Sequence, residues 1–357
     1  MSNKQFTYLI GAGASAQKIP VINNFSAGLT EFAQYIEKVV LIEDSFHDID
    51  HKPSEIQERF VQDIRWLAKE CKEHSSVDTF ARKLYLSNRT KELIKLKAIV
   101  SEFLLTKQIQ NGIDTRYDAF FAALLDKKHS ELFLPDNIKI LSWNYDKQIE
   151  YSIAQFKSSH DNGEIDNFLQ LFPRADNTTF DPKKFCLFKL NGAIGGTIKS
   201  NDGGYAPLIV DFDLMGDKIT KEIEQNIIKN MMSRFYFIEQ RIFHIAYYKK
   251  ETHDDYPTIQ YSWENNPLFD SVRNNALSAT KETEILIIIG YSFPTFNRFL
   301  DKKLLQNMGH LRKVFVQSPQ NTIKGVVQRF KSIYEFTDEI EIEEITNVDE
   351  FYIPFEY

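Results

Sequence analysis

The chain has 357 residues, of which 43% are hydrophobic, and this is enough material for a large buried core. Its formal net charge of -7 argues against direct nucleic-acid binding, which needs a basic surface that displaces counterions from phosphate groups. The two cysteines cannot form a four-cysteine zinc site and no paired-histidine spacing replaces them, so we expect no metal.

Neither a signal peptide nor a membrane span is expected. No basic flank with an apolar stretch precedes the first predicted strand, and the longest apolar runs, such as 285–289, are too short to cross a bilayer. We therefore expect a soluble cytoplasmic protein with reduced thiols and no membrane contact.

Apolar residues recur with a period near two in some segments and near 3.6 in others, which predicts strands that alternate with helices. Strands are expected at 6–10, 138–142, 185–190, 284–289, 313–317 and 339–345. Helices are expected at 25–42, from 53 onward, and at 78–86, 91–108, 115–125, 219–248, 295–306 and 321–334. The stretch 158–181 is rich in Asn and Asp and predicts a loop.

This alternation is typical of a doubly wound, Rossmann-like parallel sheet in an α/β fold. We expect residues 1–357 to form a single domain. Residues 1–24, 135–210 and 283–357 would supply its Rossmann-like framework, and insertions at about 25–130 and 215–280 would add a helical layer.

Small residues follow the first predicted strand directly, in the order Gly11-Ala12-Gly13-Ala14-Ser15-Ala16. This order fits the G-x-G-x-x-G/A pattern, in which small residues let the backbone approach a pyrophosphate next to a helix N-terminus. Small residues also form ordinary tight turns. The acidic residue usual about twenty positions later, at the end of a second strand, is missing. The pattern therefore predicts a nucleotide site but not a conventional dehydrogenase.

Three further turns follow predicted strands, at the sheet edge where ligands bind in open α/β folds. Trp143-Asn144-Tyr145-Asp146 offers a carboxamide for a water or ribose hydroxyl and a carboxylate for a carboxamide nitrogen, although Asp146 would also suit a helix cap. Lys189-Leu190-Asn191-Gly192 opens a loop with further glycines at 195, 196, 203 and 204. Gly290-Tyr291-Ser292 suits either a phosphate or a plain strand-to-helix turn.

In this order the segments resemble the sirtuin family: the Gly-Ala-Gly-Ala-Ser opening, the loop with Pro20, Asn144-Tyr145-Asp146, Lys-Leu-x-Gly and Gly290-Tyr291-Ser292. The resemblance covers the strand framework and is thin through the inserted helices. With Ser76-Val77-Asp78-Thr79-Phe80 and no cysteine pairs, the chain looks closest to bacterial sirtuin-like proteins of anti-phage defence, which hydrolyse NAD. A chain of this size without a fused Argonaute-like or sensor domain resembles the partner of a HerA-type ATPase.

The resemblance implies that NAD is the substrate or ligand. Asn144 would place the water or ribose hydroxyl at the reacting sugar carbon, and Asp146 would hold the nicotinamide carboxamide. The pyrophosphate would lie against Gly11, Ala12, Gly13 and Ser15, with Pro20 and Gly290 also contacting NAD and Ser292 near the adenosine side. Ser318 stands where the family has an Asn that contacts the adenine ribose.

Asn191 departs from the family, which has a general-base histidine at this position of the Lys-Leu-x-Gly turn. Asparagine has no titratable proton near neutral pH and cannot take a proton from water. Nicotinamide leaves as a neutral molecule from a cationic ring, so its departure needs no acid and residual hydrolysis is expected. An engineered substitution that traps bound NAD would have the same appearance.

The expected function is therefore that of an NAD glycohydrolase that depletes NAD in anti-phage defence, with Asn144, Asp146 and Asn191 as its catalytic residues. A homo-oligomer is expected. The alternative is a catalytically weak or inactive subunit that binds NAD or ADP-ribose and regulates an assembly. A third hypothesis is an interaction scaffold with the same fold and an empty site.

Overall fold

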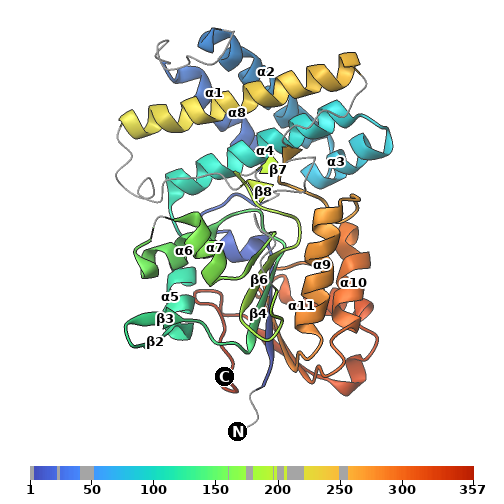
Figure 1. Cartoon of the computed structure of the whole chain (residues 1–357). Helices are drawn as coiled ribbons and strands as arrows, with labels where there is room; N and C mark the ends of the chain where they lie inside the picture. The colour runs from blue at the N-terminus through green and yellow to red at the C-terminus, as the bar shows by residue number, and fades with distance from the viewer. Residues whose placement is uncertain are drawn as a thin grey trace. The chain divides into compact units, whose positions relative to one another are not determined.

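The computed structural model describes residues 4–21, 25–40, 52–159, 161–173, 180–195, 197–198, 205–206, 221–248 and 256–357. The chain divides into two compact units (Figure 1). Unit 1 comprises Met1–Gln17, Ile113–Ala193 and Ile259–Tyr357, and unit 2 comprises Lys18–Gly112 and Ile194–Thr258. Across the described residues, no helix is both long enough and apolar enough to span a membrane.

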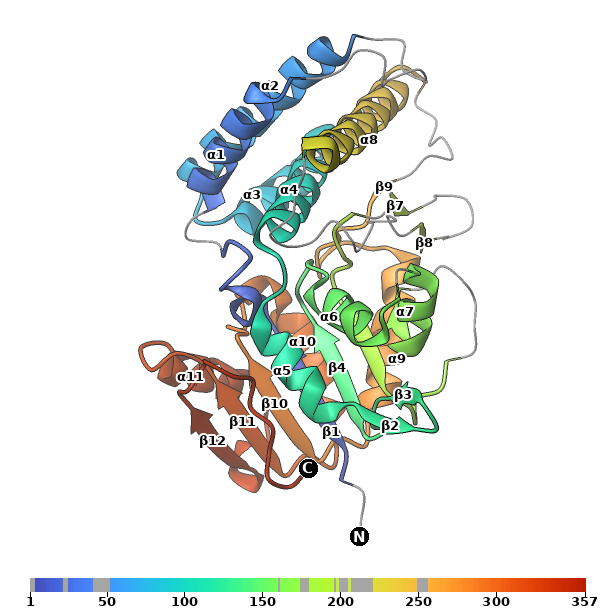
Figure 2. The same ribbon diagram turned by 90° about the vertical axis from the view of Figure 1, so that its left-hand side faces the viewer.

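Unit 1 contains a parallel sheet of seven strands in the order β12-β11-β10-β1-β4-β6-β5. Its strands are β1 (Phe6–Ile10), β4 (Ile138–Ser142), β5 (Leu171–Phe172), β6 (Cys186–Lys189), β10 (Ile285–Ile289), β11 (Lys313–Gln317) and β12 (Glu341–Ile345). Figure 2 labels the strands from β12 to β4. The chain adds β4 and β6 on one side of β1 and β10 to β12 on the other. The predicted doubly wound parallel α/β sheet is therefore confirmed.

One face of this sheet is covered by α9 (Pro267–Thr280), α10 (Arg298–Gln306) and α11 (Ile323–Ile333). Their apolar side chains form one cluster with alternate strand residues, among them Leu9, Leu141 and Ile288. Because successive side chains of a strand point to opposite faces, the remaining strand residues need a second cover. This requirement explains why the central strands β1 and β10 are buried along their whole length.

The second cover consists of α5 (Thr115–Leu124) and the C-terminal segment, defined here as residues 346–357. The Tyr8 ring meets Phe120 of α5 at a centroid distance of 5.0 Å, and Phe315 meets Tyr352 at 4.7 Å. The helices α6 (Gln148–Lys157) and α7 (Asn162–Phe168) follow β4, and β2 (Asp126–Lys128) and β3 (Glu131–Phe133) form a hairpin. The C-terminal segment, which has no regular secondary structure, thus covers part of this face, whereas helices cover the opposite face.

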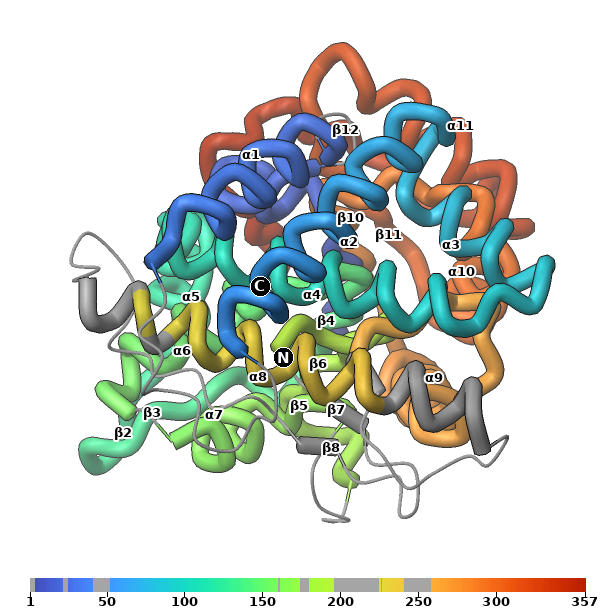
Figure 3. The backbone as a smooth tube through the Cα atoms, turned by 90° about the horizontal axis from the view of Figure 1, so that it is seen from above, coloured from blue at the N-terminus to red at the C-terminus, as the bar shows by residue number. Residues whose placement is uncertain are grey.

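Unit 2 is mainly helical. It comprises α1 (Phe25–Lys38), α2 (Pro53–Glu73), α3 (Val77–Leu86), α4 (Thr90–Asn111), α8 (Lys221–Tyr248) and the small strands β7 (Thr197–Ile198), β8 (Tyr205–Ala206) and β9 (Tyr256–Pro257). Helices α1 and α2 run side by side, and α8 packs on α2 and α4 (Figure 3). Ion pairs fix this packing: Arg59 contacts Glu239 at 2.9 Å, and Arg234 contacts Glu102 at 2.6 Å.

Two segments differ from the sequence-based prediction. The stretch 158–181, predicted as a loop, contains α7 and β5. Asp161 starts α7 by accepting from the N–H groups of Gly163 and Glu164, and a helix of seven residues is too short to show a clear period. The predicted helix 295–306 begins as a 3-10 turn, Thr295–Asn297, before α10. Gly196, Gly203 and Gly204 lie outside the described residues.

Candidate functional site

The turns that contain the predicted site residues lie at one edge of the sheet. In the sheet, Ile10 pairs with Ser142 and Ile289, while Ser142 pairs with Lys189 and Ile289 with Gln317. The residues that follow these strand ends therefore share an edge: Gly11, Trp143, Leu190, Gly290 and Ser318. The strand order reverses between β1 and β10, which is where open α/β sheets bind ligands.

The β1 turn (residues 11–15) packs backbone to backbone on the β10 turn (residues 290–292). The Gly13 N–H donates to the Gly290 carbonyl over 2.9 Å. Gly290 has φ +60°, and a Cβ added there would lie 2.2 Å from the Ala14 nitrogen. At Gly11 a Cβ would lie 2.6 Å from the Tyr291 Cα. These glycines are required by the contact between the turns, a structural reason that is independent of any ligand.

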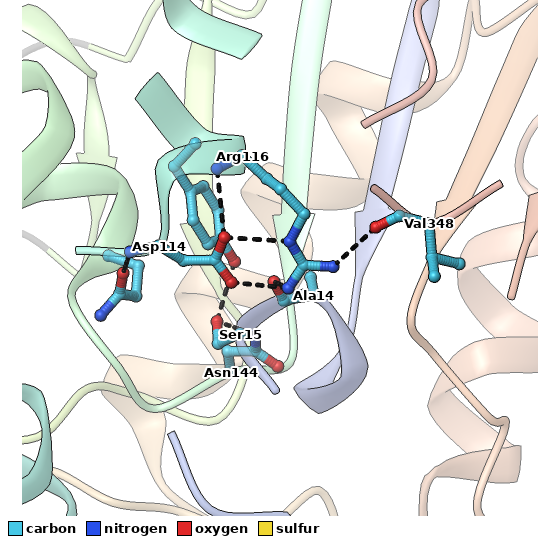
Figure 4. Close-up of polar contacts among 8 residues, drawn as sticks. Ala14, Ser15, Asp114, Arg116, Asn144 and Val348 are labelled. Atoms are coloured by element: carbon cyan, nitrogen blue, oxygen red, sulfur yellow. Dashed lines mark hydrogen bonds and ion pairs between the residues drawn. The ribbon is translucent and has the colours of Figure 1, made fainter. Parts of the chain in front are cut away.

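Ser15 links the β1 turn to the turn that follows β4 and to α5 (Figure 4). Its side chain is buried, the Asn144 Nδ2 donates to its Oγ over 3.2 Å, and the Tyr117 hydroxyl lies 2.9 Å from the same atom. Ser15 also hydrogen-bonds to the carboxylate of Asp146. The structure therefore brings together three of the predicted site residues around one hydroxyl group.

Asp146 lies in a buried group of charges. Burial raises its pKa, while the Lys189 cation and the Ser15 hydrogen bond oppose that rise. The Lys189 ammonium donates to the Asp146 carbonyl over 2.5 Å and contacts the Glu150 carboxylate at 3.1 Å. The Asp146 carboxylate also accepts from the N–H of Gln148, the first residue of α6, over 3.2 Å. Asp146 thus contacts both the start of α6 and Ser15, although the N-cap residue of α6 is Lys147.

Asn144 and Asn191 follow the paired ends of β4 and β6, and both are buried, with 5% and 6% of their surface exposed. Among the described residues, neither side-chain Oδ1 has a hydrogen-bond partner. A buried acceptor without a partner costs roughly 1–3 kcal/mol. The Asn191 backbone is fixed, since its carbonyl accepts from the Gln260 N–H over 2.8 Å. Chemically, the pair offers two acceptors to hydroxyl or N–H donors.

The sequence analysis missed Arg116 and Tyr117, at the start of α5. The Arg116 guanidinium donates to the Asp114 carboxylate over 2.9 and 2.6 Å, to the Ala14 carbonyl over 2.8 Å and to the Val348 carbonyl over 3.1 Å (Figure 4). The available signal was an Asp one residue before a predicted helix, followed closely by Arg and Tyr. That signal marks a helix start and not a ligand site.

The other predicted site residues do not belong to the hydrogen-bonded group around Ser15. Ser292 is exposed, and its carbonyl accepts from the Arg329 Nε over 2.6 Å. The Ser318 hydroxyl lies 2.8 Å from that of Thr322 at the start of α11. Ala12 is exposed within the β1 turn. Pro20 belongs to unit 2.

A buried polar network lies behind the β10 turn. The Tyr291 hydroxyl donates to the Asp301 carboxylate over 2.8 Å and accepts from the Asn297 Nδ2 over 3.0 Å. The Tyr291 ring also stacks on Trp143, which precedes Asn144. Burial raises the pKa of Asp301 to about 8, and the hydrogen bond from Tyr291 opposes the rise. This network connects the turns that follow β4 and β10.

Within the described ranges, no group of three or more His, Cys, Asp or Glu side chains is arranged to hold a metal ion. Cys71 is partly buried and Cys186 is buried, and neither forms a disulfide within the described part of the chain. At this edge Asn144 and Asn191 offer carboxamides, Ser15 offers a hydroxyl and Asp146 offers a carboxylate, and these groups bind ligands through hydrogen bonds.

Comparisons with known proteins find no matching family model and no matching curated protein. A solved structure of a Sir2 homologue in complex with NAD is similar, with 11% sequence identity, a TM-score of 0.41, and coverage of 96% of this chain and 84% of that chain. A histidine-to-asparagine mutant of a Sir2 homologue in complex with ADP-ribose has 12% identity, a TM-score of 0.38 and coverage of 96% and 86%. Because both TM-scores are below 0.5, this likeness by itself identifies neither a family nor a function.

Proposed function

We propose that unit 1 binds NAD at the strand-end edge of its sheet and hydrolyses it slowly to nicotinamide and ADP-ribose. One observation carries the proposal: the buried Oδ1 atoms of Asn144 and Asn191, both without a partner among the described residues, follow the ends of neighbouring strands. Buried polar groups are normally paired, so a pair of orphaned acceptors at a ligand-binding edge indicates donors that a ligand supplies.

NAD offers donors and charges that match the groups at this edge. A ribose supplies hydroxyl donors for the two carboxamide oxygens, and the nicotinamide carboxamide supplies N–H groups for the Asp146 carboxylate. We assign the pyrophosphate to the β1 turn, where Ala12 presents only a methyl group. The exposed Ser292 hydroxyl belongs to the β10 turn, which packs on the β1 turn, and suits the adenosine side.

In the reaction, the oxygen of a water molecule forms a bond to the sugar carbon while the bond from that carbon to the nicotinamide nitrogen breaks. The bonding electron pair returns to the ring nitrogen, and nicotinamide leaves as a neutral molecule. Asn144 orients the water, and a proton of that water passes to solvent because Asn191 accepts none. A missing general base costs roughly 100- to 10,000-fold in rate, so slow turnover is expected.

The second candidate is a catalytically inactive subunit that binds NAD or ADP-ribose and regulates an assembly. Asn191 favours it, because the position opposite Asn144 holds no group that titrates near neutral pH. A cytoplasmic homo-oligomer acting in anti-phage defence, with a HerA-type ATPase as its partner, belongs to the same proposal. That part is supported by the sequence resemblance alone.

Calorimetry and a nicotinamide-release assay test the proposal together. NAD and ADP-ribose should each bind with measurable heat, Asn144→Ala should weaken NAD binding, and Asn274→Ala, at an exposed site on α9, should not. Nicotinamide release would distinguish the glycohydrolase from the inactive subunit. Absence of heat with either ligand at millimolar concentration would overturn both candidates.

A further inference from the structure

A chain of buried hydrogen bonds runs from α5 to Asn144. The Tyr117 hydroxyl lies 2.9 Å from the Ser15 Oγ, and the Asn144 Nδ2 donates to that same oxygen over 3.2 Å. Tyr117 and Ser15 are each 1% exposed, so water does not compete for these bonds. The Tyr117 ring is held in place by Phe351 of the C-terminal segment, at a centroid distance of 4.8 Å.

The direction of each bond follows from the number of hydrogens present. Ser15 carries one hydroxyl hydrogen. We assign it to the Asp146 carboxylate, because the Ser15 hydrogen bond and the neighbouring Lys189 cation both favour the ionised form of Asp146, and an ionised carboxylate only accepts. The Ser15 oxygen must then accept from both Tyr117 and Asn144, and these two donors fill its two lone pairs. Asn144 consequently turns its nitrogen toward Ser15, and its Oδ1 is the atom without a partner.

We propose that Tyr117 is a positioning residue that fixes the orientation of the Asn144 carboxamide through the Ser15 hydroxyl. With the Tyr117 hydroxyl absent, Ser15 can rotate and donate to the Asn144 Oδ1, and the carboxamide can turn over. The side chain would then present N–H donors where a ligand hydroxyl needs an acceptor. The inference rests on the proposed function for its ligand, but the carboxamide orientation can be measured without any ligand.

The test variant is Tyr117→Phe, which removes one hydroxyl and keeps the ring against Phe351. Tyr334→Phe is its control, because Tyr334 is also buried in unit 1 and stacks on Phe330 at the end of α11. The side-chain ¹H–¹⁵N signals of Asn144, identified by their loss in Asn144→Ala, report the carboxamide environment. Titration calorimetry with NAD reports the affinity.

In Tyr117→Phe we expect shifted Asn144 signals and a roughly three- to ten-fold weaker affinity for NAD, the value of one neutral hydrogen bond. Tyr334→Phe should change neither. If Tyr117→Phe fails to fold, Ser15→Ala is the second test variant. It removes the hydroxyl that Tyr117 and Asn144 share, and it should also shift the Asn144 signals. Unchanged signals in every variant that folds would overturn the inference. If the unaltered protein bound no NAD, the proposed function would fail, while the signals would still decide the role of Tyr117.

Discussion

The guanidinium of Arg116 donates to the carbonyl oxygen of Ala14 over 2.8 Å. The same group reaches the Val348 carbonyl over 3.1 Å, and the Asp114 carboxylate neutralises it. One buried side chain therefore joins the turn after the first strand to the C-terminal segment. The conformation of the β1 turn depends on residues at the opposite end of the sequence.

Arg116→Lys should destabilise the protein by about 2–3 kcal/mol, somewhat less than the roughly 3–5 kcal/mol for removing one partner of a buried ion pair. Lysine keeps the charge, but its single nitrogen cannot span the acceptors on Asp114, Ala14 and Val348. Urea unfolding measures the loss. Arg298→Lys is the control, because Arg298 is exposed and its carbonyl contact, to Ser332, is long at 3.4 Å. Equal stability of the two variants would contradict the assigned role.

Gly290→Ala should destabilise the protein by about 2–5 kcal/mol, because left-handed backbone strain and a forced contact act together. Gly290 has φ +60°, and its added Cβ would lie 2.2 Å from the Ala14 nitrogen. Gly309→Ala is the matched control, since a Cβ there meets nothing within 4 Å and should change the stability by about 1 kcal/mol at most. The free energies of unfolding of the two variants are compared in urea. A tolerated Gly290→Ala would show that the turns do not need their close contact.

The positions of the strands and their turns could be predicted because their signals are local. An apolar run such as 285–289 ending at a glycine marks a buried strand and its exit, and parallel pairing then gathers the exits at one edge. The two-residue strand β5 offers no such run. Neither does α7, whose seven residues are mostly polar.

The grouping of the candidate site residues could be predicted in part for the same reason. Asn144, Asp146 and Asn191 lie within four residues of the strand ends that precede them, so their shared edge could be inferred from the sequence. Arg116 and Tyr117 contact the β1 turn from a helix about 100 positions away, a relation that no local pattern encodes. The glycines of the β1 and β10 turns also turned out to serve the packing of one turn on the other.

Asp301→Asn should reduce the dependence of stability on pH between about pH 4 and pH 8. The pKa of Asp301 rises from its ordinary value of 3.8 to about 8 because the side chain is buried. In that window the folded protein holds a proton on Asp301 that the unfolded chain has released. The contribution of Asp301 to the free energy of unfolding is therefore fully present below pH 4 and is lost as the pH rises toward 8. Asparagine imitates the protonated acid and removes this fall, which is on the order of a few kcal/mol.

The measurement is the free energy of unfolding of both proteins at several pH values, because subtracting the two curves cancels the titration of all other groups. Asp338→Asn, at an exposed site, should leave the curve unchanged. A difference curve for Asp301→Asn that is flat from pH 4 to pH 8 would show that Asp301 is ionised in the folded protein.

Asn191→His should raise nicotinamide release from NAD, with a gain on the order of 100-fold, the lower end of the range for a general base. The lower end is expected because cleavage of this bond is largely dissociative and the attacking water loses its proton late. Asn191 follows β6, whose last residue Lys189 pairs with Ser142 at the end of β4, two positions before Asn144. A histidine at this edge could accept the proton that asparagine cannot.

Asn144→Ala should abolish nicotinamide release both in the unaltered protein and in Asn191→His, because the water must be positioned whether or not a base takes its proton. Both variants are assayed with NAD at saturating concentration and with calorimetric confirmation that NAD still binds. Release by Asn191→His should also increase with pH through the ordinary range of a histidine pKa, near 6.5, because only the neutral imidazole accepts a proton. A histidine variant that binds NAD but is no faster than the starting protein would show that base deficiency does not limit the reaction. Asn191 would then be a structural residue at the start of its loop, and the inactive binding subunit would be the better assignment.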